Sequence, residues 1–249
     1  MISRTDYINR IKPFIGLEPI KVLTGLRRSG KSVMLKQIQS EIANNGLPEA
    51  NIISFNFESM NIPREAEMLH REVVERISGT TGKVFLSFDE IQEVQDWEKC
   101  INSLRVEYDC DIYITGSNAK LLYGELATYL AGRYVEFIIY PFSFREFMRM
   151  PTHNGEAITS AFCKYLQLGG MLPFLYKIAD NTEACNLYLT DIYNSVILKD
   201  VVRHNSIRAV AQLERVITYV LANIGHSFSA TRLSKYFKSE HRAVSYILS

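Results

Sequence analysis

Residues 25–32 read Gly-Leu-Arg-Arg-Ser-Gly-Lys-Ser and fit the pattern G-x-x-x-x-G-K-[ST], in which a glycine-bounded loop surrounds phosphate groups. A β-branched run ends at Thr24 and a helical pattern begins at about Lys31, so the loop joins a predicted strand to the N-terminus of a predicted helix. Backbone N–H groups and the positive end of the helix then converge on one anion. We therefore expect Lys31 to reach the β and γ phosphates of a nucleotide and the Ser32 hydroxyl to bind magnesium.

The other positions of this loop would support the same site. Gly25 and Gly30 allow backbone conformations and close approaches that a Cβ atom would block. Further nucleotide contacts are expected at Arg28, Ser29 and Val33. Two alternatives stay open, since Arg27 and Arg28 could be solvated surface arginines and the whole pattern could be a glycine turn that caps a helix.

Two consecutive carboxylates, Asp89 and Glu90, follow a second strong strand candidate, residues 84–88. Nucleotide hydrolysis needs a carboxylate that holds magnesium and a base that orients the attacking water, both near the carboxyl ends of neighbouring strands. We interpret Asp89 as the metal carboxylate and Glu90 as the general base, because consecutive residues that leave a strand can face the ion and the water in turn. For such a pair taken alone, the alternative is that it only caps the next helix.

Small polar residues follow a third strand candidate, residues 111–115. A side-chain amide or hydroxyl at this position could bond the γ phosphate or the attacking water, with Asn118 as the first candidate and Ser117 as the second. The phosphate loop, the acidic strand and the polar strand occur in this order, with a helical pattern between each pair. Their joint occurrence favours one nucleotide site over three unrelated structural features.

The elements that would position these residues form an alternating series in the first half of the chain. Strands are expected at residues 20–24, 51–56, 84–88, 111–115 and 134–139, and helices near 31–44, 65–77, 96–108 and 119–130. This alternation is typical of an α/β fold, in which a mainly parallel, five-stranded sheet lies between helices.

The strand patterns stop after Pro141, and we expect the rest of the chain to be helical. A short helix in 142–150 and a loop at 151–155 mark a boundary, and apolar residues then recur at three- and four-residue steps from Val210 to Ile224, which predicts one apolar helical stripe. The predicted domains are a nucleotide-binding domain at 1–150, a helical region at 151–224 and the start of a winged helix at 225–249.

Residues 229–249 have the outline of a helix-turn-helix. Ser229 can cap a helix that runs through Phe237, and Ser239 can cap a second one. The second helix would meet the major groove of DNA if this part binds DNA, although such folds also serve as protein-protein modules. Because the sequence ends inside this pattern, we expect a truncated chain.

Composition excludes several other classes of protein. The 28 Lys and Arg against 27 Asp and Glu leave a net charge of +1, so no general basic field attracts nucleic acid or membrane. No signal peptide and no membrane-spanning run is evident, which favours a cytoplasmic protein without membrane contact. The four cysteines form no Cys-x-x-Cys pair and the five histidines have no metal-ligand spacing, so we expect reduced, structural thiols and no zinc site.

Several of these runs together resemble the prokaryotic ATP-binding proteins of the AAA+ superfamily, which are related to the archaeal and signal-transduction ATPases. The resemblance is carried by residues 25–32, 88–91, 115–120, 130–133 and 140–147, and extends to 169–173 and 198–203. It implies that the polar strand lies between the phosphate-loop strand and the acidic strand, and that a helical region and a winged helix follow. Proteins of this type usually continue into an endonuclease-like domain, before which this chain stops.

The resemblance also singles out Arg133, which matches an arginine thought to sense nucleotide in the same chain or from a neighbouring subunit. A structural ion pair is the alternative for Arg133, and Arg203 could act as a second sensor. A contribution from a neighbouring subunit would require a homo-oligomer.

Taken together, the sequence predicts a magnesium-dependent ATPase in which ATP binding and hydrolysis move the helical and winged-helix parts. The preference for ATP over GTP rests on the resemblance and on the lack of an Asn-Lys-x-Asp run. A nucleotide-gated DNA-binding regulator, a P-loop kinase and a nucleotide-binding scaffold without turnover are the alternatives.

Overall fold

The computed structural model describes residues 2–116, 130, 132–150, 155–170, 175, 178–195, 210–227 and 229–237. The chain packs as two compact units, Met1–Leu189 and Thr190–Ser249. This division by packing is coarser than the three domains expected from the sequence, which stay a prediction. Within the described ranges, no helix combines the length and the apolar character needed to cross a bilayer.

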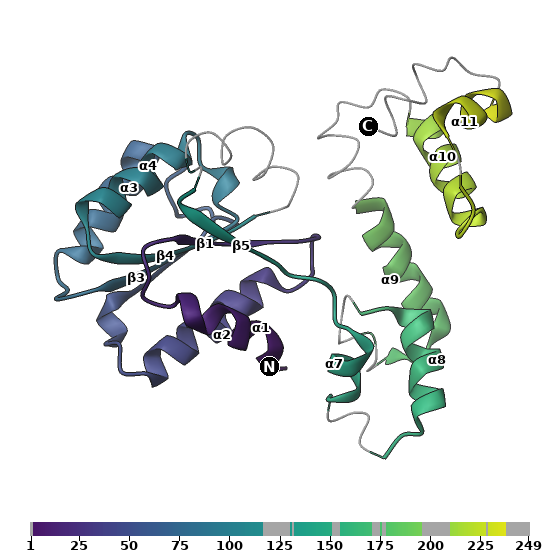
Figure 1. Cartoon of the computed structure of the whole chain (residues 1–249), viewed down its shortest axis with the longest axis horizontal. Coiled ribbons are helices and arrows are strands. Elements are labelled where there is room, and N and C mark those ends of the chain that lie inside the picture. The colour runs from purple at the N-terminus through teal and green to yellow at the C-terminus, as the bar shows by residue number, and fades with distance from the viewer. Residues whose placement is uncertain are drawn as a thin grey trace. The chain divides into compact units, whose positions relative to one another are not determined.

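A five-stranded sheet forms the centre of the first unit (Figure 1). Its strands are β1 (Ile20–Thr24), β2 (Ile52–Asn56), β3 (Val84–Asp89), β4 (Cys110–Thr115) and β5 (Tyr134–Ile138). They lie in the order β2-β3-β4-β1-β5, and every neighbouring pair is parallel. The predicted α/β fold is confirmed, and so is the expectation that the polar strand β4 lies between the phosphate-loop strand β1 and the acidic strand β3.

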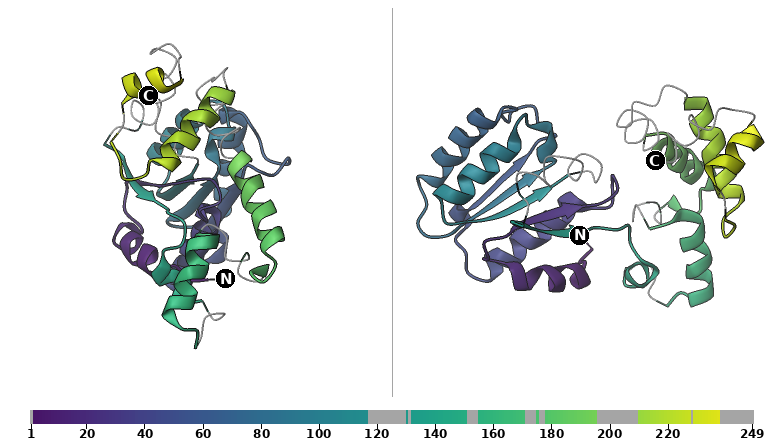
Figure 2. Two further views of the ribbon diagram at one scale, coloured as in Figure 1. Left: turned by 90° about the vertical axis from the view of Figure 1, so that its right-hand side faces the viewer. Right: turned by 45° about the horizontal axis from the view of Figure 1, so that its top comes forward.

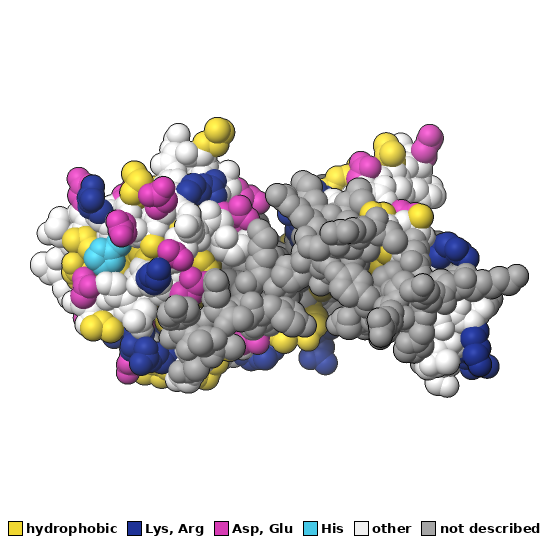
Figure 3. Space-filling model, turned by 90° about the horizontal axis from the view of Figure 1, so that it is seen from above, with side chains coloured by type: hydrophobic (Ala, Val, Ile, Leu, Met, Phe, Trp, Pro, Cys, Tyr) yellow, Lys and Arg dark blue, Asp and Glu magenta, His cyan; other side chains and the backbone are white. Residues whose placement is uncertain are grey.

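Helices cover both faces of the sheet (Figures 1 and 2). Helices α3 (Ala66–Ile77) and α4 (Trp97–Glu107) pack on one face, and α1 (Thr5–Ile11) and α2 (Lys31–Asn44) pack on the other. The described residues also include 3₁₀ turns at Lys12–Phe14, Glu49–Asn51 and Ile91–Glu93. Figure 3 looks onto the α3 and α4 side, where basic and acidic side chains are interspersed rather than gathered by sign.

Alternate residues of β3 show why the sheet needs both helical layers. Val84, Leu86 and Phe88 are buried with the α3 and α4 side chains, whereas Phe85 is buried with those of α1 and α2. All six residues of β3 are buried. A strand that is covered on both faces is mainly apolar on both sides, and β3 is so apart from Ser87, whose hydroxyl bonds with that of Ser54, and the terminal Asp89.

The helix α1 is not among the predicted elements. Its N-cap residue, Arg4, makes no side-chain capping bond, so the usual signal for the start of a helix is missing. The helix is instead held by tertiary packing, because Ile8 and Ile11 are buried against the sheet.

The first unit also contains α7 (Phe144–Met148), α8 (Ile158–Leu168) and the beginning of α9 (Thr182–Ser195). Ser143 and Glu146 form a capping box that starts α7. The backbone of Phe142 approaches Gly170 so closely that a Cβ atom there would lie 1.9 Å from the Phe142 carbonyl oxygen. Gly170 is therefore required for α7 and α8 to pack together. The predicted helix at 119–130 lies outside the described residues apart from Leu130.

The second unit contains α10 (Val210–Ala222) and α11 (Ala230–Phe237). Ser229 accepts a bond from the N–H of Arg232 at 3.3 Å, so the predicted cap is present, while the expected second helix at 239–249 lies outside the described residues. The predicted stripe on α10 is only partly right. Leu213 and Val216 are buried, but Leu221 is 58% exposed near the end of the helix, and Ile224, which is 75% exposed, lies beyond its last residue.

Candidate functional site

The predicted phosphate loop lies between the end of β1 and the start of α2, as its sequence requires. Thr24 ends the strand, and Gly30 precedes the helix with a φ of 95°. Gly25 has a φ of 141°, and a Cβ atom on it would lie 2.2 Å from the carbonyl oxygen of Ile139. Only glycine fits at position 25, because any side chain would collide with the chain that leaves β5.

Ser29 turns an unpaired hydroxyl into this loop. The residue is 1% exposed, and its Oγ is buried without a hydrogen-bond partner. This oxygen lies across the loop from Gly25, where an ideal Cβ would be 3.1 Å away. A buried polar atom without a partner carries a desolvation cost of about 1–3 kcal/mol, which a bond to a ligand oxygen relieves. The loop therefore fits a phosphate group.

Lys31 brings the loop and the acidic strand together. Its side chain is buried, and its Nζ lies 3.3 Å from the carbonyl oxygens of Gly25 and Leu26. The same Nζ lies 3.7 Å from Oε1 of Glu90. The lysine of the loop and the carboxylate predicted as the base thus face each other in one site.

Thr115 links the two predicted carboxylates. Its hydroxyl donates to Oδ1 of Asp89 at 2.5 Å and accepts from the N–H of Glu90 at 3.0 Å. Thr115 is fully buried and Asp89 is 6% exposed, so the carboxylate is held by a bond that water cannot easily replace. Thr115 was not among the predicted site residues, although it ends the predicted strand 111–115.

The backbone at Glu90 is strained. Glu90 has a φ of 60°, and Arg28 in the loop has a φ of 66°, values that residues other than glycine rarely adopt. Such strain costs on the order of 1–3 kcal/mol per residue and is concentrated at functional sites. The Glu90 carboxylate is partly accessible, and Nε2 of Gln92 donates to its Oε2 at 2.5 Å. The turn therefore presents Glu90 to the site in a fixed direction.

The residues present fit a shared magnesium ion rather than a cage made by the protein alone. In the described part of the chain, no group of three His, Cys, Asp or Glu side chains could hold a metal. Ser32 lies in the first turn of α2, and the bond from Thr115 occupies only one of the two carboxylate oxygens of Asp89. Magnesium prefers oxygen ligands and usually binds through one or two protein groups together with phosphates and water. This donor set is of that kind.

The other predicted contacts are less well defined. The Arg28 side chain turns away from the loop, since its Nη1 donates to the Tyr188 hydroxyl at 2.7 Å. Val33 is 40% exposed on the first turn of α2, and its contact with a nucleotide stays a prediction. Ser117, Asn118 and Arg203 lie outside the described residues.

Arg133 lies at the amino ends of the parallel strands, the wrong end of the sheet for a phosphate contact within the chain. Its carbonyl accepts from the N–H of Ile20, the first residue of β1, whereas the phosphate loop follows the last residue of that strand. Its side chain donates to Oδ1 of Asn102 at 3.1 Å. Parallel strands all begin at one end of the sheet and finish at the other. This placement therefore argues against a phosphate contact in the same chain. A role in a neighbouring subunit stays a prediction.

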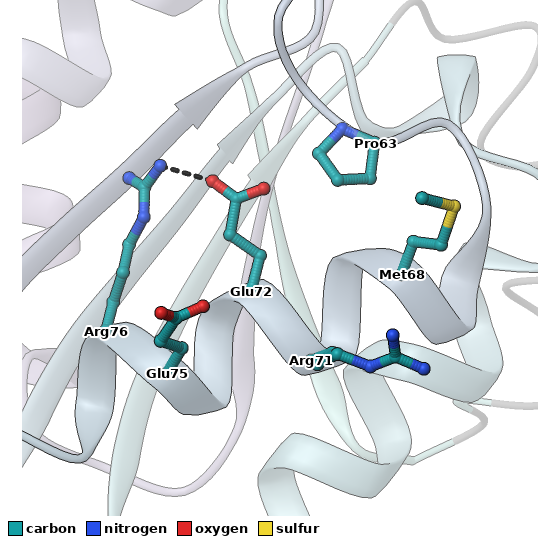
Figure 4. A pocket seen from close by; sticks show the side chains of 6 residues that line it. All are labelled: Pro63, Met68, Arg71, Glu72, Glu75 and Arg76. Atoms are coloured by element: carbon teal, nitrogen blue, oxygen red, sulfur yellow. Dashed lines mark hydrogen bonds and ion pairs between the residues drawn. The ribbon is translucent and has the colours of Figure 1, made fainter.

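An open groove of about 500 Å³ lies elsewhere, along α3 (Figure 4). Its lining residues are Pro63, Met68, Arg71, Glu72, Glu75 and Arg76. Arg76 pairs with Glu72 one turn away at 2.5 Å and lies over the Phe55 ring at 4.3 Å. These are the features of a salt-bridged helix surface, and the groove has no part in the candidate site.

Comparisons with known proteins find relatives of this chain in a bacterium and in an archaeon. Among curated proteins, an uncharacterized protein of Haemophilus influenzae is 35% identical over 244 residues, which are 96% of this chain and 60% of that protein. An uncharacterized protein of Methanocaldococcus jannaschii is 28% identical over 236 residues, which are 91% of this chain and 52% of that protein. The chain thus spans between half and three fifths of the length of these relatives.

A solved structure of a RuvB variant from Thermotoga maritima aligns with the whole of this chain and 88% of its own, with a TM-score of 0.52 and 12% identity. At that identity the likeness shows a shared fold. A model of a domain of unknown function matches residues 159–249. A model described as an AAA domain matches residues 17–148, which is more than half of the sequence, and the chain therefore belongs to the AAA domain family.

Proposed function

We propose that this chain binds ATP with magnesium at the loop between β1 and α2 and hydrolyses the terminal phosphoanhydride. The observation that carries the proposal is the approach of Lys31 to Glu90, with 3.7 Å between Nζ and Oε1. It unites a phosphate-binding cation and a partly accessible carboxylate beyond the carboxyl ends of β1 and β3, the two strands on either side of β4, where nucleotides bind in open α/β sheets.

The chain's own residues divide the work as follows. Lys31 and the backbone N–H groups of the loop bind the phosphates, and the Ser29 hydroxyl adds a bond. Ser32 and Asp89 would hold magnesium, which when bound offsets the negative charge of the phosphates. Glu90 accepts a proton from water as the water attacks the γ phosphorus, and the bond to the β–γ bridging oxygen breaks. The products are ADP and inorganic phosphate.

The finer roles remain part of the proposal. Asn118 or Ser117 would report the γ phosphate, and Arg133 would act only across an interface between two copies of the chain. Movement of the helical and winged-helix parts and a cytoplasmic location complete the proposal. The location is in line with the free thiols of Cys100, Cys110, Cys163 and Cys185.

Phosphate release from magnesium-ATP tests the proposal with two variants. Lys31→Ala should lose ATP binding, because the phosphates lose their buried cation. Glu90→Gln should still bind ATP but turn over about 10²- to 10⁴-fold more slowly, the usual contribution of a general base. Lys36→Ala on the exposed side of α2 and Glu67→Gln on α3 are matched controls that should behave as the wild type.

Two results would contradict the proposal. Equal turnover by wild type and Glu90→Gln would remove Glu90 as the base, and no ATP binding by the wild type would remove the function. A parallel assay with duplex DNA at several salt concentrations tests the alternative of a DNA-binding regulator, for which ATP-dependent binding should weaken as salt rises.

A further inference from the structure

Arg4, which precedes α1, is a buried cation that contacts the phosphate loop. The residue is 2% exposed, although it lies near the start of the chain. Its Nη1 donates to the carbonyl oxygen of Ser29 at 3.1 Å. Its guanidinium lies over the rings of Tyr7 and Phe142, at 4.4 and 4.6 Å from their centroids. A buried arginine requires partners for its charge and its N–H groups, and here one partner is the loop itself.

The charge of Arg4 is balanced by Glu146 in α7. Arg4 Nε donates to Oε1 at 2.8 Å and Nη2 donates to Oε2 at 3.1 Å, a two-pronged pairing that fixes the plane of the guanidinium. Glu146 is itself held, because its Oε2 accepts from the N–H of Ser143 at 2.9 Å in the capping box of α7. Nη1 is thus directed at Ser29 by a pair that α7 anchors.

The contact with Ser29 sets the direction of a loop N–H group. The carbonyl of Ser29 and the N–H of Gly30 belong to one planar, trans peptide unit, in which the two groups point in opposite directions. Because Arg4 holds the carbonyl on one side, the Gly30 N–H is turned to the other side. Gly30, with a φ of 95° and no side chain, would otherwise let this peptide rotate at little cost.

We propose that Arg4 is a positioning residue of the phosphate loop. It holds the Ser29–Gly30 peptide so that the N–H of Gly30 is directed at the phosphates. Because Glu146 fixes Arg4, this geometry depends on the position of α7. The inference rests on the proposed nucleotide site. The inference extends the nucleotide site to the N-terminal segment and to α7. Sequence patterns do not link these two segments to the phosphate loop.

Arg4→Lys is the central test. Lysine keeps the charge for Glu146 but offers one compact ammonium group in place of the planar fork, so it cannot serve both Glu146 and Ser29 in the same way. We expect the dissociation constant for magnesium-ADP to rise at least about tenfold, since 1.4 kcal/mol corresponds to that factor and a bond to a charged group contributes about that much. Glu146→Gln should weaken ADP binding in the same direction.

A matched control exists in the same two segments. Arg149 pairs with Asp6 at 3.5 Å, which also links the region after α7 to α1, but both side chains are about half exposed and neither contacts the loop. Arg149→Gln should leave ADP binding unchanged. Unfolding temperatures of all variants are measured, and ADP binding is compared well below each of them.

A spectroscopic readout separates positioning from general stability. The sequence contains two Ser-Gly pairs, Ser29–Gly30 and Ser78–Gly79, so carbonyl-¹³C serine with ¹⁵N glycine selects these two amide signals. In Arg4→Lys the Gly30 signal should move even without ADP, and its further shift on adding magnesium-ADP should shrink. The Gly79 signal, at the end of α3, should stay in place.

Each outcome decides the matter. Weaker ADP binding together with a displaced Gly30 signal supports the proposal. Wild-type ADP affinity and an unmoved Gly30 signal in Arg4→Lys, or a lower unfolding temperature alone, overturn it and leave the proposed function standing. If Arg4→Lys does not fold, the same measurements on Glu146→Gln decide. Failure of the wild type to bind ADP overturns the proposed function and this inference together.

Discussion

The hydroxyl of Thr115 donates a 2.5 Å hydrogen bond to the Asp89 carboxylate. The direction of this bond follows from the carboxylate, whose oxygens only accept. The same hydroxyl oxygen also accepts from the N–H of Glu90. One buried hydroxyl therefore fixes the metal carboxylate and the backbone of the proposed base relative to each other.

Replacement of Thr115 distinguishes the contribution of its hydroxyl bonds from the contribution of side-chain packing. Thr115→Val keeps the shape but leaves the Asp89 oxygen and the Glu90 N–H without a partner, at a cost of about 1–3 kcal/mol each. We expect a lower unfolding free energy in urea and slower phosphate release from ATP, with ATP binding less affected. Thr115→Ser should retain most of the unfolding free energy and most of the rate of phosphate release, because its hydroxyl can make the same two bonds. A valine variant that turns over ATP at the wild-type rate would contradict this account.

The collision predicted at Gly25 gives a second test. In Gly25→Ala the new Cβ would meet the carbonyl oxygen of Ile139 at 2.2 Å, so the loop or the segment after β5 must move. Gly46→Ala is the control, because Gly46 also has a positive φ of 97° but nothing within 4 Å of an added Cβ. Gly46→Ala should lose about 1–2 kcal/mol of unfolding free energy from left-handed strain. Gly25→Ala should lose clearly more and also lose ATP binding; equal losses would contradict the predicted collision.

The strands and the phosphate-loop helix could be predicted from the sequence because their signals are local. Strand β1 and helix α2 have the predicted bounds, and the other strands differ by about one residue at an end. Both faces of the sheet are covered, so the strands are rich in apolar residues, although each also contains polar ones such as Lys21 in β1 and Asp111 in β4. Glycine, lysine and serine at fixed spacing then mark the turn between β1 and α2.

Features that depend on distant residues could not be predicted in this way. The contact between Arg4 and Glu146 joins positions 142 residues apart, and the capping box that contains Glu146 does not indicate Arg4 as a partner. Arg133 illustrates the opposite case, since it precedes the first residue of β5 and parallel pairing places it at the end of the sheet away from the loop. That conclusion follows from strand direction alone. The role of Thr115 could not be predicted because it consists of bonds to Asp89 and Glu90, which lie 26 and 25 residues away in the chain.

The four cysteines differ in reactivity in a way that tests the fold. Burial raises the pKa of Cys100 to about 12 and that of Cys110 to about 11, and Cys185 is also buried, whereas Cys163 is exposed. Since the thiolate is the reactive form, a disulfide reagent at pH 8 should modify about one thiol per folded chain quickly and the others only after denaturation. Cys163→Ser should abolish the fast phase. Any fast thiol in that variant would show that the described core is not packed as stated.

The pairing of Arg4 with Glu146 also predicts a pH dependence of stability. Burial raises the pKa of Glu146, but the hydrogen bonds and charge of Arg4 together with the bonds from Ser143 outweigh it, so the net pKa lies below the ordinary value of 4.5. Between these two values the unfolded chain binds more protons than the folded one, so the unfolding free energy falls as the pH falls. The contribution is present above about pH 4.5 and is lost below it, as the pH passes through the lowered pKa of the folded state. Glu146→Gln cannot titrate, so its unfolding free energy, measured in urea from pH 6 downward, should fall less steeply in this acid range than that of the wild type. Parallel curves for the two proteins would show that Glu146 is not held as a buried, ionised partner of Arg4.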